Sequence, residues 1–255
     1  MTSAPAIFSP SYYERLDVLE RRHWWCRSVR RVAIDLIRPL GARAGVVLDA
    51  GCGTGGFLSA LAAGRFAMRG IGADLSLDAL DLARGHGLRD LLDASVVALP
   101  VASQAIDLVI SNDVLQHLPA EDDRRAVAES YRVLKPGGFF CLRSNLGAPV
   151  AADPSLHRRY DRESFARLVS EQGFSILKHV LLHPLARLWS DLRRPPRGGH
   201  PEHHSHGLSL ALPPAPINAV MDLYARAEDA IVRRLPFRAP LGDAQIILAQ
   251  RPRIS

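Results

Sequence analysis

The chain has 255 residues, of which 47% are hydrophobic and 23% are charged, and its formal net charge is +6. These values are ordinary for a globular protein, and the length suits one α/β domain with additions. No block of five or six like charges occurs, so charge alone gives no indication of nucleic-acid binding. The three scattered cysteines suggest neither a disulfide framework nor a zinc site. Because no signal segment or long apolar run is visible, we expect a cytoplasmic protein.

The N-terminal part of the chain reads as helical. Tyr12 to Leu40 is predicted to form two helices with the aromatic cluster His23-Trp24-Trp25 between them, and Pro39 and Gly41 end the second one. We interpret residues 1–43 as a helical lid ahead of the main domain, which spans residues 44–182.

Strand-like and helix-like segments alternate through that main domain. The predicted strands, together with one near the C-terminus, are Val46–Ala50, Arg69–Asp74, Leu91–Ala94, Ile106–Asn112, Phe139–Arg143, Phe174–Leu182 and Ala244–Gln250. The predicted helices are Phe57–Ala63, Leu77–His86, Glu121–Leu134 and Arg162–Gln172. We place Lys135 at the C-terminal dipole of the third of these helices, with Pro136-Gly137-Gly138 ending it. The alternation predicts an α/β fold with a parallel sheet and helices on both faces.

An insertion of about 60 residues, 183–243, separates the last two predicted strands. We expect it to form a helical cap, with a helix from Ile217 to about Leu235. Such an insertion can also be an oligomerisation element, so we expect a monomer or a homodimer. The basic amphipathic segment 181–198 could contact a membrane surface, but packing in the cap is the favoured interpretation. His200, His203, His204 and His206 could ligate a metal, yet no Cys or Asp ligands flank them, so we predict no metal site.

The stretch around which the chain is organised is "VVLDAGCGTGG", residues 46–56, which reads as a buried strand, a glycine turn and the start of a helix. Its glycines satisfy Gly-x-Gly-x-x-Gly, which alone would also fit a dinucleotide fold. Asp49 precedes the turn, where it would repel a pyrophosphate but not a cationic or hydroxyl-rich ligand. Asp74 ends the second strand, where a carboxylate can accept hydrogen bonds from both hydroxyls of a ribose.

Together with "GADLS", "ALPVASQAIDLVISNDVLQHL" and "RVLKPGGFF", this stretch resembles the class I S-adenosylmethionine-dependent methyltransferases of the ubiquinone-biosynthesis-like, type 11 group. The resemblance covers roughly residues 44–182. It implies a Rossmann-like seven-stranded sheet whose last strand, Ala244–Gln250, runs antiparallel beside Phe139–Arg143. It also implies S-adenosyl-L-methionine as the cofactor.

The resemblance assigns a part of the cofactor to each matching residue. It implies that Asp49, Gly51 and Gly53 line the methionine end, that Asp74 holds the ribose, that Leu75 packs on the adenine and that Asn112 lies near the cofactor. Ser95 stands where such families often place an Asp that meets the adenine amino group. The Ser95 hydroxyl and the Val96 amide would then contact the adenine more weakly than an Asp carboxylate. The alternative for Asp49 and Asp74 is capping or turn chemistry.

The N-terminal segment "YYERLDVLERRHWWCRSVRRVAIDLI" is similar to the first helices of bacterial methyltransferases with a Glu…His-Trp-Trp…Arg-Arg pattern. In those proteins the aromatic pair lies over the cofactor cleft as a lid, which implies that Trp24 contacts the substrate. Core packing between two helices is an equally weighted alternative.

Methyl transfer to a hydroxyl also needs a general base. His157 is the preferred candidate because it lies in the loop after the fifth strand, with Arg159 and Tyr160 as substrate contacts. His117 is a second candidate, although in many relatives a histidine there shapes the site. For His157, helix capping or simple solvation is the alternative.

The prediction is therefore an S-adenosylmethionine-dependent methyltransferase whose partner is a small-molecule acceptor, through a hydroxyl of a glycan or secondary metabolite. Alternatives are a prenylated or lipid acceptor at a membrane surface, a nicotinamide-dependent oxidoreductase, and a non-catalytic S-adenosylmethionine-binding subunit. No nucleic-acid partner is expected.

Overall fold

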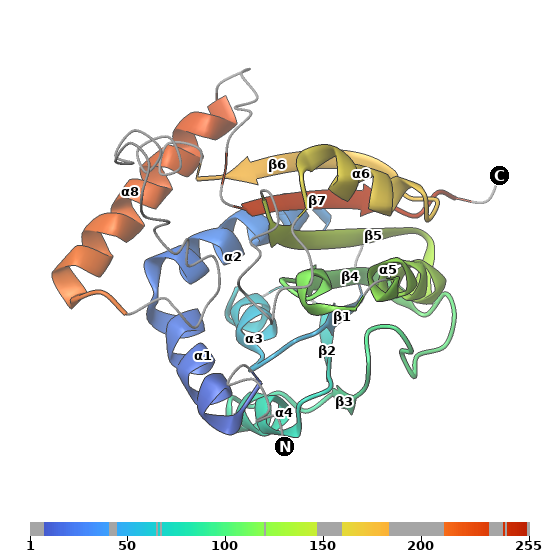
Figure 1. Cartoon of the computed structure of the whole chain (residues 1–255), viewed down its shortest axis with the longest axis horizontal. Coiled ribbons are helices and arrows are strands. Elements are labelled where there is room, and N and C mark those ends of the chain that lie inside the picture. Colours follow the sequence, from blue (N-terminus) through green and yellow to red (C-terminus); the bar gives the residue numbers. More distant parts are fainter. Residues whose placement is uncertain are drawn as a thin grey trace.

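Seven strands form one sheet, in the order β3-β2-β1-β4-β5-β7-β6 (Figure 1). The computed structural model describes residues 8–40, 45–64, 66, 68–119, 121–146, 160–183, 212–234, 242 and 244–253. The strands are β1 (Val46–Ala50), β2 (Arg69–Asp74), β3 (Leu91–Asp93), β4 (Ile106–Asn112), β5 (Leu134–Asn145), β6 (Ser175–Leu182) and β7 (Ala244–Gln250). The α-helices are α1 (Pro10–Arg22), α2 (Trp24–Ile37), α3 (Gly56–Ala63), α4 (Leu77–Gly85), α5 (Asp122–Val133), α6 (Arg162–Ser170) and α8 (Ala215–Arg234).

The strand directions confirm the predicted Rossmann-like sheet. Strands β1 to β5 pair in parallel, and β7 runs antiparallel between β5 and β6. Strand β1 has β2 on one side and β4 on the other, so the chain reverses its direction of travel across the sheet at this point. In open α/β sheets, ligands bind outside the carboxyl ends of the strands at such a switch point.

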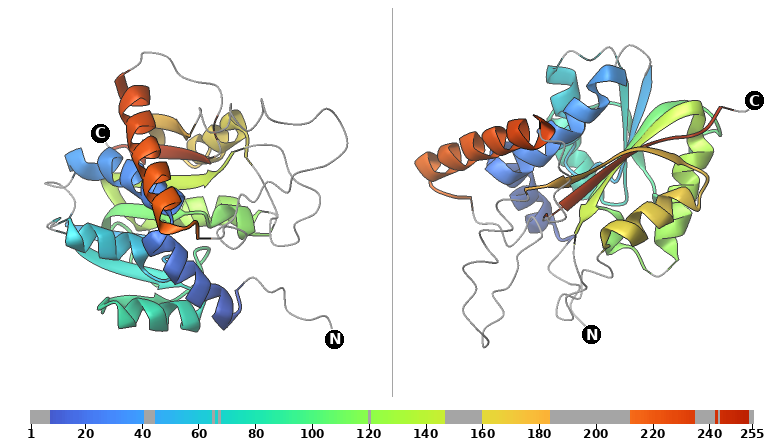
Figure 2. Two further views of the ribbon diagram at one scale, coloured as in Figure 1. Left: turned by 90° about the vertical axis from the view of Figure 1, so that its left-hand side faces the viewer. Right: turned by 90° about the horizontal axis from the view of Figure 1, so that it is seen from above.

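Side chains that alternate along the strands build a separate core on each face of the sheet. On one face Leu48 and Val109 pack with residues of α5 and α6, among them Phe165. On the other face Val47 and Leu108 pack with residues of α2 and α3. Figure 2 shows helices on both sides of the sheet. Because both faces are covered, the central strands read in the sequence as nearly continuous apolar runs.

A single buried residue, His23, separates the two N-terminal helices, whereas the sequence predicted the whole cluster His23-Trp24-Trp25 between them. The backbone N–H of His23 donates to the Leu19 carbonyl and closes α1, while its Nδ1 accepts from the Trp25 amide (3.1 Å) and caps α2. Both tryptophans consequently lie in the first turn of α2, rather than in a linker between the helices.

The start of β5 differs from the prediction, since the strand begins at Leu134 and includes Lys135-Pro136-Gly137-Gly138. Lys135 does not serve the dipole of α5; its Nζ donates to Asp107 Oδ1 (2.8 Å). A register shift in β4 next to Asp107 accommodates these residues. At Gly138 a Cβ would meet the Lys135 carbonyl oxygen at 2.8 Å, which explains why glycine stands at this close approach.

Of the insertion, the structure describes α8, which packs along α2 (Figure 1). The basic segment beyond residue 183 and the histidine-rich loop 200–206 lie outside the described residues. Within the described chain, no helix combines the length and apolar character needed to cross a bilayer, and no cluster of three or more His, Cys, Asp or Glu residues is placed to hold a metal ion.

We predict that Asp107→Ala destabilises the fold by about 1–3 kcal/mol, because one carboxylate joins the starts of three strands. Its Oδ2 accepts from the Val46 amide (2.9 Å) and its Oδ1 from Lys135. Chemical denaturation measures the change. The exposed Asp93→Ala is the control and should stay within about 0.5 kcal/mol of the wild type. Equal stability of both variants would contradict this role for Asp107.

Candidate active site

A cavity of about 790 Å³ lies at the carboxyl ends of β1, β2 and β4. Its floor is the glycine turn after β1 together with the residues that follow β2 and β4. Residues of α1 and α2 line its other side. The cofactor-binding residues predicted from the sequence that line this cavity are Gly51, Gly53, Asp74, Leu75, Val96 and Asn112.

The glycine turn has a backbone shape that a side chain would disturb. Gly51 and Gly53 both have positive φ angles, +83° and +53°, which favour glycine. A Cβ on Gly51 would overlap the side chain of Val114. The Gly51 and Cys52 amides donate to the Ala73 carbonyl at 2.8 and 2.9 Å and tie the turn to β2. The resulting bare backbone at the cavity floor allows a ligand to approach closely.

Asp74 lines the cavity and also fixes the turn. Its Oδ2 accepts from the Gly53 amide (2.8 Å) and its Oδ1 from the Ser76 amide (3.0 Å). Burial raises the pKa of Asp74, although these amide hydrogen bonds act in the opposite direction. The Leu75 amide acts on the pKa of Asp74 in the same way as those of Gly53 and Ser76. A carboxylate has about four acceptor positions, so Asp74 fixes the turn and keeps acceptor capacity for a ribose hydroxyl.

Three carboxylates gather around the turn; we call Glu20, Asp49 and Asp74 the acidic trio. Burial, and then the charges of Glu20 and Asp74, raise the pKa of Asp49 well above its usual value. Asp49 is 2% exposed and is not one of the residues that line the cavity. Like charges held this close raise one another's pKa, and a cation nearby would relieve the repulsion. The trio therefore suits a cationic ligand.

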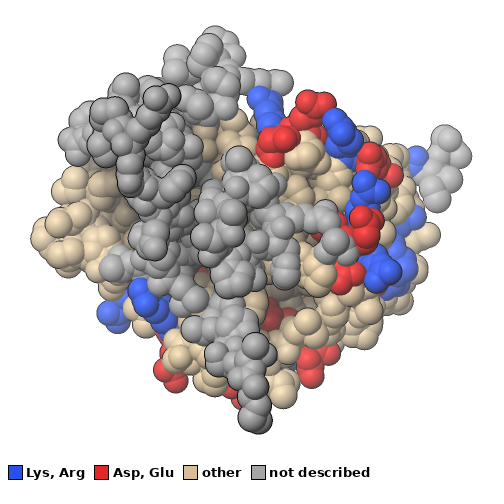
Figure 3. Space-filling view, viewed as in Figure 1, with Lys and Arg blue, Asp and Glu red and all other residues tan. Residues whose placement is uncertain are grey.

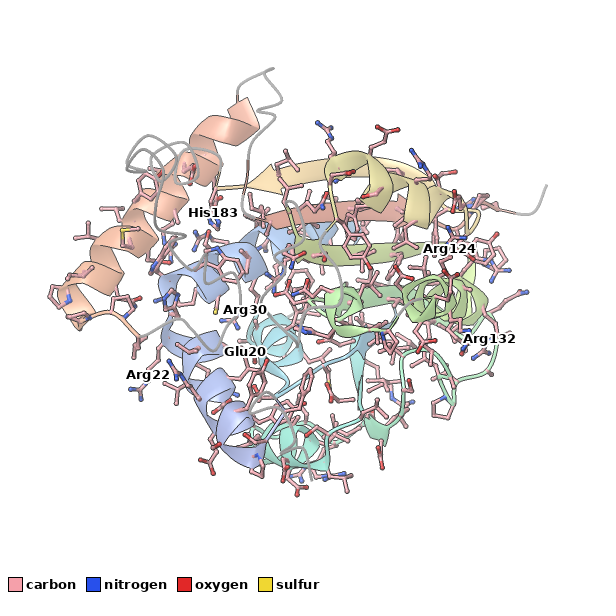
Figure 4. All side chains as sticks on the ribbon, in the orientation of Figure 1. Glu20, Arg22, Arg30, Arg124, Arg132 and His183 are labelled. Atoms are coloured by element: carbon pink, nitrogen blue, oxygen red, sulfur yellow. The ribbon has the colours of Figure 1, made fainter. Side chains whose placement is uncertain are left out.

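Glu20 reaches the trio from α1. Its Oε2 accepts from the Thr54 hydroxyl (2.7 Å), and it lines the cavity beside Arg30 of α2. Figure 4 shows both side chains in the space between the N-terminal helices and α3. A Cβ on Gly56, the first residue of α3, would meet Glu20 Oε2 at 2.6 Å and Arg30 Nη1 at 3.3 Å. Burial raises the pKa of Glu20, while the Thr54 hydrogen bond and Arg30 lower it.

The side of the cavity assigned to the adenine is apolar. Leu75 is 68% exposed although it is a leucine, and it lines the cavity with Ala94 and Val96. Ser95 does not line it; the Ser95 hydroxyl accepts instead from the Val97 amide (3.4 Å). Asn112 does line it, and its buried Oδ1 has no hydrogen-bond partner. These features fit a planar aromatic group on Leu75 and a donor opposite Asn112.

Aromatic side chains and a salt bridge also line the cavity. Tyr12, Tyr13, Trp25 and His117 line it, and Arg143 extends over the Trp25 ring with its Cζ 5.3 Å from the ring centroid. Arg143 also pairs with Asp113. Burial raises the pKa of Tyr13 to about 12, and that of Tyr12 is raised for the same reason, so both phenols stay protonated at neutral pH.

Two of the predicted substrate contacts lie away from the cavity. Trp24 is not among its lining residues; the Trp24 ring contacts His183 and its amide donates to Asn218 Oδ1 (3.0 Å). Tyr160 is buried and donates its hydroxyl to Asp123 Oδ2 (2.9 Å). The neighbouring Trp25 occupies the position that we had expected of Trp24.

The remaining predicted residues divide between the cavity and the segments that are not described. His117 lines the cavity, and its ring meets that of Phe8 edge-on at 5.6 Å between centroids. His157 and Arg159 lie outside the described residues. Sequence reasoning did not place Glu20 and Arg30 in the site, although both belong to the Glu…His-Trp-Trp…Arg-Arg pattern that had been noticed.

Comparison with known proteins identifies the family. A family model described as a methyltransferase domain matches residues 48–142. A methyltransferase of Encephalitozoon cuniculi is 38% identical over 184 residues, which cover 62% of this chain and 81% of that relative. This chain belongs to the S-adenosylmethionine-dependent methyltransferases. The alternative of a nicotinamide-dependent oxidoreductase is therefore wrong, and the predicted cofactor is confirmed.

Solved structures share the methyltransferase fold. An S-adenosylmethionine-dependent methyltransferase from Archaeoglobus fulgidus has a TM-score of 0.62 at 16% identity, and the match covers 94% of this chain and 99% of that one. The [4+2]-cyclase SpnF has a TM-score of 0.57 at 24% identity, with 90% and 84% covered. This methyltransferase spans less than two thirds of three of the first four curated relatives, namely 23%, 62% and 66% of their lengths.

We predict that Asp74→Ala weakens binding of S-adenosylhomocysteine by about 1–3 kcal/mol, because hydrogen bonds to the ribose and to the turn are lost together. Isothermal titration calorimetry measures the affinity. Asp81→Ala, whose side chain is 72% exposed on α4, is the matched control and should bind like the wild type. If the Asp74 variant folds and binds as tightly as the control, Asp74 does not hold the ribose.

Proposed function

We propose that this methyltransferase transfers a methyl group to a hydroxyl of a small molecule, of the glycan or secondary-metabolite class. The observation that carries the proposal is that one cavity is lined both by two carboxylates of the acidic trio, Glu20 and Asp74, and by aromatic side chains that the proposed cofactor contacts do not use. Its volume of about 790 Å³ lies in the range of pockets that enclose small ligands, which leaves space for an acceptor beside the cofactor.

In this proposal each part of the cofactor has its own residues. Asp74 accepts from the ribose hydroxyls, and Leu75 with Val96 covers the adenine. Gly51 and Gly53 lie against the methionine end, where Glu20 and Asp74 line the cavity and the buried Asp49 adds to the field that favours the positive charges of the cofactor. Ser95, whose hydroxyl is engaged by the Val97 amide, contributes through the backbone around it.

Bound S-adenosylmethionine supplies an electrophilic methyl group on a sulfonium. The protein's own task is alignment of the acceptor and exclusion of water. Trp25, Tyr12 and Tyr13 offer aromatic faces to an acceptor. Residues of α1 and α2 line the side of the cavity across from the glycine turn and shield part of it from solvent.

A hydroxyl acceptor must lose its proton as the new O–C bond forms. Among the described residues that line the cavity, His117 is the one with an imidazole, so we assign it the proton in the described part of the site. His157 remains a second candidate base, and Arg159 a substrate contact, on the sequence argument alone.

The fold by itself does not specify the reaction, since SpnF, with a similar fold, is named as a [4+2]-cyclase. The direct test supplies S-adenosylmethionine with a radiolabelled methyl group and fractions of a metabolite extract to the purified protein. Label in a small-molecule product that carries the new methyl group on oxygen, as a methyl ether, supports the proposal. Tight S-adenosylhomocysteine binding with no labelled product in any fraction would favour a non-catalytic subunit, and label in the lipid fraction would favour a lipid acceptor.

We predict that His117→Ala lowers kcat for the labelled acceptor by about 100-fold, because the hydroxyl proton then has no positioned base. The affinity for S-adenosylhomocysteine should stay the same, since the proposed cofactor contacts do not include His117. An unchanged kcat would remove His117 as the base.

A further inference from the structure

Gln116 is a buried side chain of the cavity wall whose amide has a fixed orientation. It is 1% exposed and lies in the short helix Leu115–His117 that follows β4. Its Oε1 accepts from the Ser144 hydroxyl (2.9 Å) and from the Asn145 amide (3.2 Å). Because a backbone amide only donates, the oxygen of the Gln116 side chain must face β5. Its Nε2 is left over as a donor, for which the described residues supply no acceptor.

Arg143, the residue of β5 before Ser144, has a second unused donor. It is 9% exposed and also lines the cavity. Its Nη2 pairs with Asp113, and its Cζ lies over the Trp25 ring. Its Nη1 is buried and has no hydrogen-bond partner. A buried donor without an acceptor costs free energy, so a ligand oxygen at this point would stabilise the site.

Asp113 holds the Arg143 guanidinium in place. Besides the ion pair, the Asp113 backbone amide donates to the Arg143 carbonyl (3.0 Å). The φ angle of Asp113 is +57°, a conformation that residues other than glycine seldom adopt. Strained backbone of this kind clusters at functional sites. Because Asp113 and Trp25 both fix the guanidinium, Nη1 cannot turn toward another acceptor without breaking one of these contacts.

The charges around the cavity favour a neutral oxygen acceptor for these donors. Asp113 already balances the charge of Arg143. Carboxylic acids outnumber arginines among the described lining residues, which include Glu20, Asp74, Asp78 and Asp113 on one side of the count and Arg30 and Arg143 on the other. On the right-hand side of Figure 3, Lys and Arg residues alternate with Asp and Glu instead of forming a basic patch. A carboxylate ligand would be repelled here, whereas a ketone, ester or amide oxygen would not.

We propose that Gln116 Nε2 and Arg143 Nη1 donate to a neutral carbonyl oxygen of the methyl acceptor, which is a hydroxylated aromatic carbonyl compound. The two donors lie close together because Gln116 binds the two residues that follow Arg143. The aromatic part of the acceptor fits the rings of Trp25, Tyr12 and Tyr13 in the same cavity. This inference rests on the proposed function and narrows its acceptor class. Gln116 and Arg143 determine specificity, since they contact the acceptor away from the oxygen that is methylated.

Binding of three small probes to the protein saturated with S-adenosylhomocysteine tests the proposal without turnover. Meta-hydroxyacetophenone has the ring, the hydroxyl and a ketone. Meta-ethylphenol has nearly the same shape without the carbonyl oxygen, and meta-hydroxybenzoate has a carboxylate instead. We expect the ketone to bind about tenfold more tightly than meta-ethylphenol, because meta-ethylphenol leaves both donors unpaired.

Two variants test the two donors separately. Gln116→Leu removes Nε2, and Arg143→Lys keeps a charge for Asp113 but has no second nitrogen for the ligand. In each, the ratio of the two affinities should fall below about threefold, with the affinity for meta-ethylphenol unchanged. Arg84→Lys, whose side chain is 49% exposed on α4, is the matched control and should keep the wild-type ratio.

Four results would overturn the proposal. They are equal wild-type affinities for the ketone and meta-ethylphenol, tightest binding of meta-hydroxybenzoate, an unchanged ratio in either folded variant, and no measurable binding of any probe. The thermal midpoint of each variant confirms that it is folded, and if one variant does not fold the other decides. Transfer of a labelled methyl group to the probes is measured separately. If the ratios are as expected but no hydroxyl is methylated, the proposed function fails and the carbonyl site stands.

Discussion

The arrangement of this active site depends on three carboxylates that share a small, largely buried volume around a glycine turn. Asp49 lies beneath the turn, Asp74 fixes it from β2, and Glu20 reaches it from α1. Each of the three pKa values is raised by burial, and the charges of Glu20 and Asp74 raise that of Asp49 further. Such a site disfavours a pyrophosphate and favours a ligand with positive charge. The buried carboxylates around the glycine turn therefore favour a cationic cofactor.

Because Glu20 of α1 is one of these three carboxylates, the N-terminal helices contribute directly to the site. Glu20 and Arg30 reach the first residue of α3 because glycine at position 56 leaves them room. The buried His23 sets the angle at which α1 and α2 meet, and it brings Trp25 to the cavity wall. The same helix α2 holds α8 through Arg27 and Arg31 on its other side. Helix α2 thus contacts both the cavity and α8.

The fold was largely predictable because its strands have strong local signals. Val46–Ala50, Arg69–Asp74, Ile106–Asn112 and Ala244–Gln250 have the predicted boundaries, since apolar runs end there at glycine or polar residues. The start of β5 was missed because Pro136 and two glycines favour a turn, whereas pairing with β4 and the Asp107–Lys135 contact extend the strand. This pairing is tertiary and leaves no local pattern.

The residues around the glycine turn were predictable because they form local sequence motifs. The contribution of the N-terminal helices was not predictable in this way. Gly51, Gly53 and Asp74 belong to one contiguous motif, whereas Glu20 meets Thr54 across 34 residues of sequence. Trp25 lines the cavity and Trp24 does not, because consecutive residues of a helix point in different directions. Where α2 begins depends on the cap at His23, and the sequence of three aromatic residues did not reveal this start.

The most direct test of the acidic trio is the number of protons released when S-adenosylmethionine binds. A cation stabilises ionised carboxylates, so binding should lower their raised pKa values and expel protons at any pH where the free protein holds these carboxyls partly protonated. Calorimetric titration in buffers of different ionisation enthalpy counts these protons. The account predicts net release by the wild type and a smaller release by Glu20→Gln. No release by the wild type, or equal release by the variant, would contradict it.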